Sequence, residues 1–305
     1  MMAMYEQDRF IAGDCREVLP VLARQRRRFQ TCITSPPYFR LRDYDGLPGQ
    51  IGMEDSVTDY VSALVGVFRQ VRNVLKENGT LWLNLGDSHV SRRNRDYTGG
   101  TALKPKDLMG LPWRVALALQ DDGWYLRQDI IWLKSNAMPE SVSDRCTQAH
   151  EYLFLLSKRP RYYFNADAIS ELSLTFGEPD ADDKANFARN RGKRTGVTPP
   201  GSNSIAHRAD RAPTIASEMR NRRSVWEIAT TPTDHPHTAP FPRALVGLCL
   251  MAATEEGDWV LDPFGGSGTV AAVANNLSRH WISIELDERY RDLHEERTLQ
   301  VPLNF

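Results

Sequence analysis

Two loops of this 305-residue chain carry residues that could do chemistry. One of them, Asp262–Thr269, has the sequence DPFGGSGT and places three glycines within four positions. Glycines lack Cβ atoms, so the backbone of such a loop can approach a ligand closely. Glu285 ends the next apolar run, where an acidic side chain accepts hydrogen bonds from ribose in nucleotide-binding α/β folds. Glycine loops also join strands to helices in many folds, but this combination favours a nucleoside-containing cofactor.

The type of cofactor is indicated by what the glycine loop lacks. No lysine follows Gly268, which argues against ATP bound by a phosphate-cradling P-loop. The spacing also differs from the GxGxxG of dinucleotide folds, and Asp262 would repel a pyrophosphate but attract a cationic ligand. S-adenosyl-L-methionine, with its ammonium, sulfonium and ribose, fits these features better. An NAD-type oxidoreductase is the alternative from another enzyme class.

The second loop is Ser35-Pro36-Pro37-Tyr38, and its two prolines stiffen the backbone. An exocyclic amino group on a nucleobase is a poor nucleophile because its lone pair is conjugated into the ring. The Ser35 hydroxyl and the Pro36 carbonyl could accept hydrogen bonds from its N–H groups and free that lone pair, while Tyr38 stacks on a base flipped out of the double helix. A surface turn or a polyproline ligand is the competing interpretation.

Two further features suggest ligand contacts. Gly13-Asp14 follows another apolar run and could hold the adenine of the same cofactor, although Gly-Asp is common in turns. In the segment 184–223, basic residues outnumber acidic ones by about eight, which suits contact with DNA phosphates. Such a segment could also be a solvated loop, or belong to a non-catalytic DNA-binding protein. The residues expected to contact DNA are Arg92, Arg93, Arg189, Arg191, Lys193, Arg194, Arg208 and Arg211.

The composition is that of a globular protein. The chain has 38 Lys+Arg, 39 Asp+Glu and a hydrophobic share of 41%, which excludes disorder over most of its length. The four cysteines form no CxxC pair, so neither a zinc module nor a disulfide framework is indicated, and no metal is expected. Charged residues interrupt the N-terminal segment, and no apolar run is long enough to span a membrane. We expect a cytoplasmic protein without membrane contact.

The elements that must position these loops alternate between strands and helices. Strands are expected at 9–12, 30–34, 80–85, 126–134, 151–157, 161–165, 258–262 and 281–285. Helices are expected from a cap at Ser56 to Asn78-Gly79, from Pro112 to Gly123, over 242–254, from the glycine loop to Asn276, and from Asp287 onward. This alternation predicts a doubly wound, mostly parallel α/β sheet that binds ligands at the carboxyl ends of its strands.

With these motifs the chain resembles the DNA amino-methyltransferases of bacterial restriction–modification systems and phages, in the class whose catalytic motif precedes the cofactor motif. The matching segments are Thr34–Tyr38 for the catalytic motif, Leu261–Thr269 for the cofactor motif, Ile284-Glu285 with Tyr290 for the ribose motif, His237-Thr238 with Phe241-Pro242 for an element that lines the cofactor site, and Trp132–Asn136 with Pro139 and His150-Glu151 for elements near the target base. The resemblance covers almost the whole chain outside the basic segment.

The resemblance implies a circularly permuted, Rossmann-like sheet of seven strands with three parts: a catalytic half over 1–171, a target-recognition region over 172–226 and an S-adenosylmethionine-binding half over 227–305. It implies catalytic roles for Ser35, Pro36, Pro37 and Tyr38. It implies cofactor contacts for Asp14, Thr238, Phe241, Asp262, Phe264, Gly265, Gly266, Ser267, Gly268, Thr269 and Glu285.

The target base follows from one residue of the catalytic motif. Serine at its first position, Ser35, resembles the N4-cytosine branch of the family, whereas aspartate is the commoner sign of adenine. None of the four cysteines follows a proline, so the Pro-Cys nucleophile of cytosine carbon-5 enzymes is absent. We therefore expect methyl transfer to the N4 amine of a flipped cytosine, with transfer to N6 of adenine as the alternative. The implied partners are double-stranded DNA and a cognate restriction endonuclease, with the enzyme acting as a monomer or homodimer.

Overall fold

The computed structural model describes residues 8–41, 43, 46–91, 94–99, 101–173, 218–230 and 241–299. They belong to two compact units, of which the larger contains the chain up to Asn165 and from Arg223 onward, and the smaller contains 166–222. In the smaller unit, the short helix η3 (Asp167–Ile169) precedes an antiparallel pair of strands, β6 (Glu171–Leu172) and β7 (Met219–Arg220). The candidate site lies in the larger unit.

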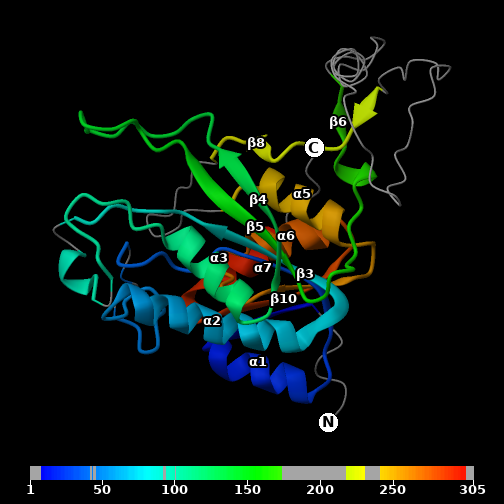
Figure 1. The fold of residues 1–305 in the computed structure, drawn as a ribbon. Coiled ribbons are helices and arrows are strands. Elements are labelled where there is room, and N and C mark those ends of the chain that lie inside the picture. The colour runs from blue at the N-terminus through cyan, green and yellow to red at the C-terminus, as the bar shows by residue number, and fades with distance from the viewer. Residues whose placement is uncertain are drawn as a thin grey trace, which may run out of the picture. The chain divides into compact units, whose positions relative to one another are not determined.

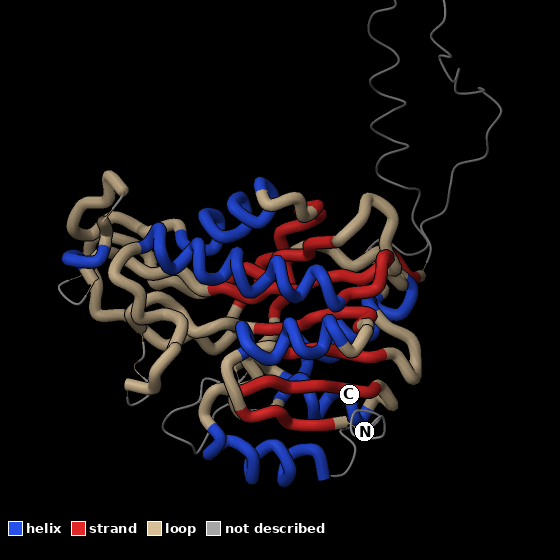
Figure 2. The backbone as a smooth tube through the Cα atoms, turned by 90° about the horizontal axis from the view of Figure 1, so that it is seen from below, coloured by secondary structure: helices blue, strands red, loops and turns tan. Residues whose placement is uncertain are grey.

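An eight-stranded sheet forms the centre of the larger unit, in the order β1-β10-β9-β2-β3-β5-β4-β8 (Figures 1 and 2). The strands are β1 (Arg9–Ala12), β2 (Phe29–Thr34), β3 (Leu75–Leu85), β4 (Tyr125–Leu133), β5 (His150–Ser157), β8 (Val225–Glu227), β9 (Trp259–Asp262) and β10 (His280–Glu285). Only β5 runs antiparallel to its neighbours, so the prediction of a mostly parallel α/β sheet is confirmed. Strand β8 was not among the expected strands, and it gives the sheet an eighth strand where the family resemblance implied seven.

Helices pack in two groups of three, which Figure 1 shows on opposite faces of the sheet. One group is α1 (Cys15–Arg24), α2 (Val57–Val74) and α3 (Leu111–Asp121), and the other is α5 (Arg243–Ala253), α6 (Thr269–Asn276) and α7 (Arg291–Leu299). The short helices η2 (Arg95–Tyr97) and η4 (Glu288–Tyr290) lie in connections. Helix α2 begins where expected, because the Ser56 hydroxyl accepts a hydrogen bond of 3.0 Å from the Asp59 amide.

The main core lies between the sheet and the first helix group. Buried side chains from α1, α2 and α3 pack there against alternate residues of β3, namely Leu81, Leu83 and Leu85. Alternate residues of a strand point to opposite faces, so Trp82 and Asn84 face the other side of the sheet. There Trp82 packs against Trp226 of β8, which is 3% exposed. The apolar contacts of Trp226 thus belong to the sheet, although the sequence places this residue at the end of the target-recognition region.

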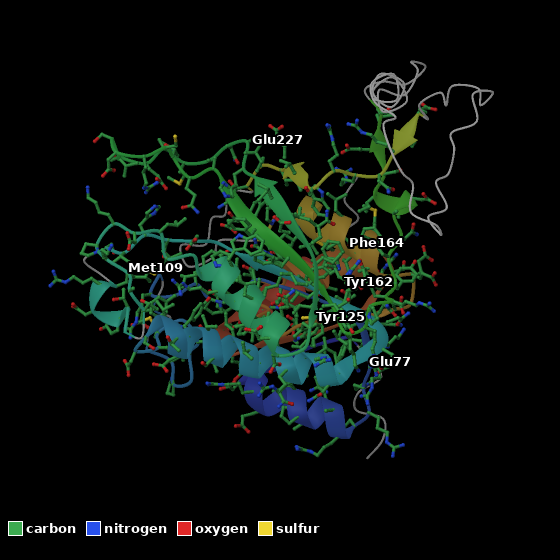
Figure 3. The ribbon with its side chains drawn as sticks, in the orientation of Figure 1. Glu77, Met109, Tyr125, Tyr162, Phe164 and Glu227 are labelled. Atoms are coloured by element: carbon green, nitrogen blue, oxygen red, sulfur yellow. The ribbon has the colours of Figure 1, made fainter. Side chains whose placement is uncertain are left out.

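Two expected elements differ from the structure. The helix expected to reach Asn78-Gly79 ends at Val74, because the backbone becomes extended at Leu75 and joins β3 beside Phe29. The segment 161–165 is not a strand. Its amides instead bond to separate neighbours, Tyr163 to the Asn78 carbonyl and Asn165 to the Ala252 carbonyl. The ring of Phe164, labelled in Figure 3, stacks on Trp82.

The topology gathers loops from distant parts of the chain at one edge of the sheet. Because β1, β2, β3, β4, β9 and β10 run in the same direction, their carboxyl ends share that edge. Strand β5 runs the opposite way and therefore starts there, with His150 and Glu151. Within the described ranges, no helix is long and apolar enough to cross a membrane.

Candidate active site

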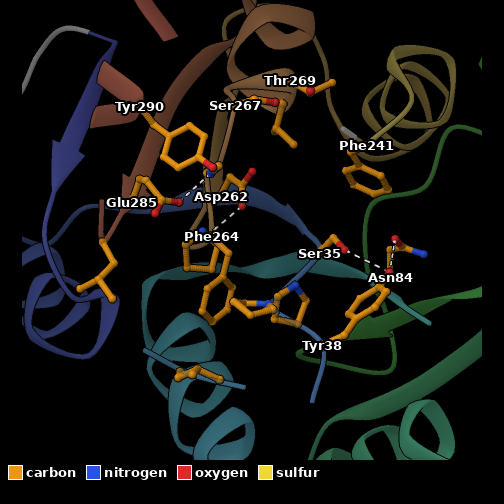
Figure 4. A pocket seen from close by; sticks show the side chains of 18 of the residues that line it. Ser35, Tyr38, Asn84, Phe241, Asp262, Phe264, Ser267, Thr269, Glu285 and Tyr290 are labelled. Carbon is orange, nitrogen blue, oxygen red and sulfur yellow. Dashed lines mark hydrogen bonds between the residues drawn. The ribbon is translucent and has the colours of Figure 1, made fainter. Parts of the chain in front are cut away.

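A cavity of about 470 Å³ opens at this edge of the sheet. Most of the predicted site residues line it: Asp14, Ser35, Pro36, Pro37, Tyr38, Phe241, Asp262, Phe264, Gly265, Gly266, Ser267, Thr269 and Glu285. Figure 4 shows Ser35 and Tyr38 on one side of it, and Asp262 and Glu285 on the other. The structure therefore brings the proline loop and the glycine loop, more than 220 residues apart in the sequence, to one site.

The remaining predicted residues either do not line the cavity or are outside the described residues. Gly268 caps the start of α6 and is not among the residues that line the cavity. Thr238 and all the residues expected to contact DNA lie outside the described residues: Arg92, Arg93, Arg189, Arg191, Lys193, Arg194, Arg208 and Arg211.

The proline loop leaves the buried strand β2 and is held by groups outside it. The Tyr60 hydroxyl, on α2, donates a 3.0 Å hydrogen bond to the Pro37 carbonyl. Gly52 has φ +101°, and a Cβ atom there would lie 3.2 Å from the Tyr38 carbonyl oxygen. A glycine at this position lets the neighbouring segment pack closely against the loop. The loop is thus fixed by more than the stiffness of its prolines.

The Tyr38 side chain has a defined orientation. Its hydroxyl donates a 2.6 Å hydrogen bond to Glu151 Oε2, and Asn84 Oδ1 lies 3.3 Å away as a second acceptor. Its ring lies against Gly86, where a Cβ atom would come within 2.6 Å of the ring. Burial and the nearby Glu151 carboxylate raise the pKa of the Tyr38 phenol well above its usual range. Tyr38 is therefore a neutral hydrogen-bond donor whose ring borders the cavity.

Asp262 is the buried acid of the glycine loop. One of its carboxylate oxygens accepts hydrogen bonds from the Thr34 hydroxyl at 2.7 Å and from the Phe264 amide at 3.1 Å. The side chain is almost fully buried, and this desolvation raises the pKa of Asp262 to about 7. A buried carboxyl group of this kind gains from a cationic ligand, which would stabilise its ionised form.

The glycine loop packs too tightly for side chains at two of its positions. A Cβ atom at Gly265 would lie 2.0 Å from Ser283 Oγ. Gly268 has φ +79°, and a Cβ atom there would lie 2.8 Å from the His294 ring. His294 is buried and bonded through its two ring nitrogens to the Ser283 hydroxyl and the Tyr290 carbonyl. Burial lowers the pKa of His294 to about 4, so a neutral imidazole supports this loop.

Glu285 and Asp14 both reach the cavity but differ in their other contacts. Glu285 accepts hydrogen bonds from the Gly266 amide at 2.7 Å and the Asp287 amide at 3.0 Å, and burial raises its pKa. Asp14 caps α1 by accepting from the Arg16 amide at 2.8 Å, and it forms a 2.5 Å ion pair with the same arginine. The Gly-Asp pair thus has the local structural role that its sequence suggested, in addition to its place beside the cavity.

Three polar residues that line or support the site were not among the predicted site residues. Lys134, at the end of β4, forms a 2.6 Å ion pair with Glu151 at the start of β5, and both line the cavity. Their segments matched elements near the target base, but nothing in the sequence indicated that the two residues pair. Arg297 of α7 donates a 2.6 Å hydrogen bond to Ser267 Oγ. Its position in a charged amphipathic helix gave no signal of this contact.

Comparison with known proteins places the chain in a family. A family model described as DNA methylase, for N6 and N4 methyltransferases, matches residues 29–296. The type II methyltransferase M.SmaI of Serratia marcescens is 44% identical, over 96% of this chain and 91% of its own length. The type II methyltransferase M.Cfr9I of Citrobacter freundii is 40% identical, over 92% of this chain and 85% of its own length.

Solved structures share the fold. The PvuII DNA methyltransferase, described as cytosine-N4-specific, superposes with a TM-score of 0.62 at 19% identity, over 97% of this chain and 87% of its own. The protein TTHA0409 of Thermus thermophilus, in complex with S-adenosyl-L-methionine, superposes with a TM-score of 0.57 at 23% identity, over 95% of this chain and 93% of its own. These likenesses confirm a methyltransferase fold. The family model and the type II relatives show that the chain belongs to the DNA methylase family that its motifs resemble.

Proposed function

We propose that this DNA methylase transfers a methyl group from S-adenosylmethionine to the exocyclic N4 amine of a cytosine flipped out of double-stranded DNA. One observation carries the proposal. The Ser35 loop and the Asp262 loop line the same cavity, and the Thr34 hydroxyl next to Ser35 donates a 2.7 Å hydrogen bond to Asp262. A group that binds the amine and a group that binds the methyl donor are thereby held side by side, as a one-step transfer requires.

The cavity fits S-adenosylmethionine, the methyl donor of this family. The buried Asp262 carboxylate suits its ammonium group, and the tightly packed glycine loop leaves backbone free to approach it. A carboxylate can accept about four hydrogen bonds, so Glu285 can bind ribose hydroxyls while it holds two backbone amides. Phe241 and Phe264 add apolar surface to the lining. When bound, the cofactor supplies an electrophilic methyl group on a sulfonium centre.

The proline loop supplies the acceptors for the amine. The Ser35 hydroxyl and the Pro36 carbonyl, both in the cavity lining, accept hydrogen bonds from the N–H groups of the target base. These contacts favour the tetrahedral geometry in which the nitrogen lone pair can attack a methyl group. The Tyr38 ring, fixed by Glu151, offers a surface on which the flipped base stacks.

Cytosine N4 is the proposed target because Ser35 leads the catalytic motif. Transfer to N6 of adenine by the same mechanism is the alternative.

The type II relatives support a restriction–modification system in the bacterial cytoplasm, with a cognate restriction endonuclease that recognises the same DNA sequence. We further propose that the region 172–226 and its basic residues bind DNA, that the strand order reflects a circular permutation, and that the enzyme acts as a monomer or homodimer.

Identification of the methylated nucleoside tests the proposal. Unmethylated DNA is incubated with the protein and with S-adenosylmethionine that carries a deuterated methyl group, then digested and examined by mass spectrometry. We expect labelled N4-methylcytosine. Labelled N6-methyladenine would contradict the choice of base. DNA in which neither cytosine nor adenine carries the label would contradict the activity. The same experiment with NAD in place of the methyl donor should give no product.

A further inference from the structure

A chain of hydrogen bonds leads from the reacting side of the cavity to an ion pair. Ser35 Oγ lies 3.5 Å from the Tyr38 hydroxyl oxygen (Figure 4). That hydroxyl oxygen lies 2.6 Å from Glu151 Oε2. The other oxygen of Glu151, Oε1, accepts a 2.6 Å hydrogen bond from Lys134 Nζ. These residues all line the cavity. They come from segments of the chain that meet because β5 starts at the edge where β2, β3 and β4 end.

The partners of Tyr38 determine the direction of each hydrogen bond. A lysine ammonium only donates and a carboxylate only accepts, so Glu151 accepts from both Lys134 and Tyr38. Asn84 donates its amide hydrogen to the Tyr152 carbonyl at 3.2 Å, which turns its oxygen toward Tyr38. The single hydroxyl proton of Tyr38 therefore faces two acceptors. Its oxygen can serve Ser35 only as an acceptor.

This arrangement sets the direction of the Ser35 hydroxyl, which also has a single proton. Because that proton is directed to Tyr38, the lone pairs of Ser35 Oγ are left to face the cavity. An oxygen presented in this way accepts hydrogen bonds from an amino group and has nothing to offer a carbonyl oxygen. Cytosine carries an amino group at its fourth ring position, where uracil carries a carbonyl.

We propose that Glu151 is a positioning residue which, through Tyr38, fixes Ser35 as a hydrogen-bond acceptor and so selects a base with an exocyclic amino group over one with a keto group. This inference rests on the proposed function and adds the basis of its selectivity. Lys134 takes part because it holds the carboxylate in place, and Gly86 takes part because its lack of a side chain lets the Tyr38 ring reach Glu151.

Glu151→Gln tests the proposal with little change of shape. Lys134 can only donate, so the new amide turns its oxygen to Lys134 and its N–H group to Tyr38. Tyr38 must then turn its own proton to Asn84 Oδ1 or to Ser35 Oγ, so Ser35 is no longer held to the role of donor. Tyr38→Phe directly removes the hydroxyl group that links Ser35 to Glu151. The matched control is Glu77→Gln on β3, because Glu77, labelled in Figure 3, pairs with Lys158 at 2.8 Å and does not line the cavity.

The measurement is the affinity for duplexes that carry either cytosine or uracil at the methylated position. Each base is placed opposite an abasic nucleotide, so that base pairing does not contribute to the difference. S-adenosylhomocysteine is present at saturation. We expect the wild type and Glu77→Gln to prefer cytosine by about tenfold or more, because an acceptor that faces a keto group goes unsatisfied. We expect Tyr38→Phe to bind the two duplexes with nearly equal affinity, and Glu151→Gln to prefer cytosine clearly less than the wild type does.

A second readout separates this role from damage to the fold. Affinity for S-adenosylhomocysteine should stay at the wild-type level in Glu151→Gln, while the single-turnover methylation rate falls by about tenfold or more. The proposal is overturned if Glu151→Gln and Tyr38→Phe keep the wild-type preference for cytosine, or if Glu77→Gln loses it equally. Should the product be N6-methyladenine, the proposed target base fails but the inference does not, and the same comparison is then made between adenine and hypoxanthine.

Discussion

The two loops that line the cavity are held in place by different means. The proline loop depends on polar side chains from distant segments, since Tyr60 bonds to its backbone and Glu151 bonds to its Tyr38 hydroxyl. The glycine loop depends on close packing, with Gly265 against Ser283 and Gly268 against His294. The difference fits their proposed tasks. A loop that acts on a reacting amine needs polar groups in fixed directions, whereas a loop that binds a cofactor needs backbone that a ligand can approach.

The largest effect should come from a substitution in the proline loop. Ser35→Ala removes an acceptor for the target amine and should lower the single-turnover methylation rate by about 100-fold or more, as loss of a key polar group in other active sites does. The rate is measured at saturating cofactor and DNA. Ser62→Ala, at an exposed position of α2 outside the cavity, is the control and should keep the wild-type rate. A Ser35→Ala enzyme with a near-normal rate would remove Ser35 from the chemistry.

Added side-chain volume in the glycine loop should destabilise the protein. Gly265→Ala places a Cβ atom 2.0 Å from Ser283 Oγ, so something must shift, and we expect a loss of about 1–3 kcal/mol in the free energy of unfolding. Denaturant titration measures it. Gly66→Ala is the matched control, because Gly66 lies in α2 with no atom within 4 Å of the added group. It should be neutral or stabilising. Equal losses in the two variants would contradict tight packing at Gly265.

The pH dependence of cofactor binding should depend on Asp262. Its pKa of about 7 in the free protein means that the carboxyl group is protonated below pH 7 and must lose its proton to pair with the ammonium group of the ligand. The affinity for S-adenosylhomocysteine should therefore fall by about tenfold per pH unit below pH 7 and level off above it. Calorimetry from pH 5 to 8 would check this.

Two controls separate the titration of Asp262 from other effects of pH. Methylthioadenosine lacks the ammonium group, so its affinity should change little over the same range. Asp262→Asn removes the titrating carboxyl group and should flatten the profile for S-adenosylhomocysteine. A wild-type profile that is already flat would argue against an Asp262–ammonium contact.

The smallest effect is expected away from both loops. Ser56→Ala removes the hydrogen bond to the Asp59 amide that caps α2 and should cost about 1 kcal/mol in the free energy of unfolding. Because Tyr60 on the same helix contacts the proline loop, a small loss of methylation rate should accompany it. A rate loss as large as that of Ser35→Ala would mean that the helix end, rather than the serine, controls the proline loop.

Most of the fold could be predicted from the sequence because its signals are local. The Ser56 cap, Pro112 at the start of α3 and the apolar runs of β2 and β9 each depend on a few neighbouring residues. The errors came from long-range packing. Leu75 leaves the helical pattern to pair beside Phe29, and the aromatic segment 161–165 packs Phe164 on Trp82 without joining the sheet. Strand β8 has only three residues and gives little sequence signal of its own.

For the candidate site, too, local motifs could be predicted from the sequence and long-range contacts could not. Short motifs identified Ser35, Asp262, Gly265 and Glu285, because backbone demands and chemistry restrict which residues can occupy such loops. The support from Glu151, His294 and Arg297 could not be read from the sequence, since it depends on how β5 and α7 meet the loops in space. The residues that position a site are thus harder to predict than the residues that line it.

The affinity of two variants for S-adenosylhomocysteine, measured side by side by calorimetry at pH 8, tests the division of labour between the loops most directly. Asp262→Asn should bind at least about tenfold more weakly than the wild type, because it loses a charge-assisted contact in a buried site. Ser35→Ala should bind as tightly as the wild type while it fails to methylate DNA. The opposite pattern, with weak binding in Ser35→Ala and normal binding in Asp262→Asn, would contradict the roles assigned to both loops.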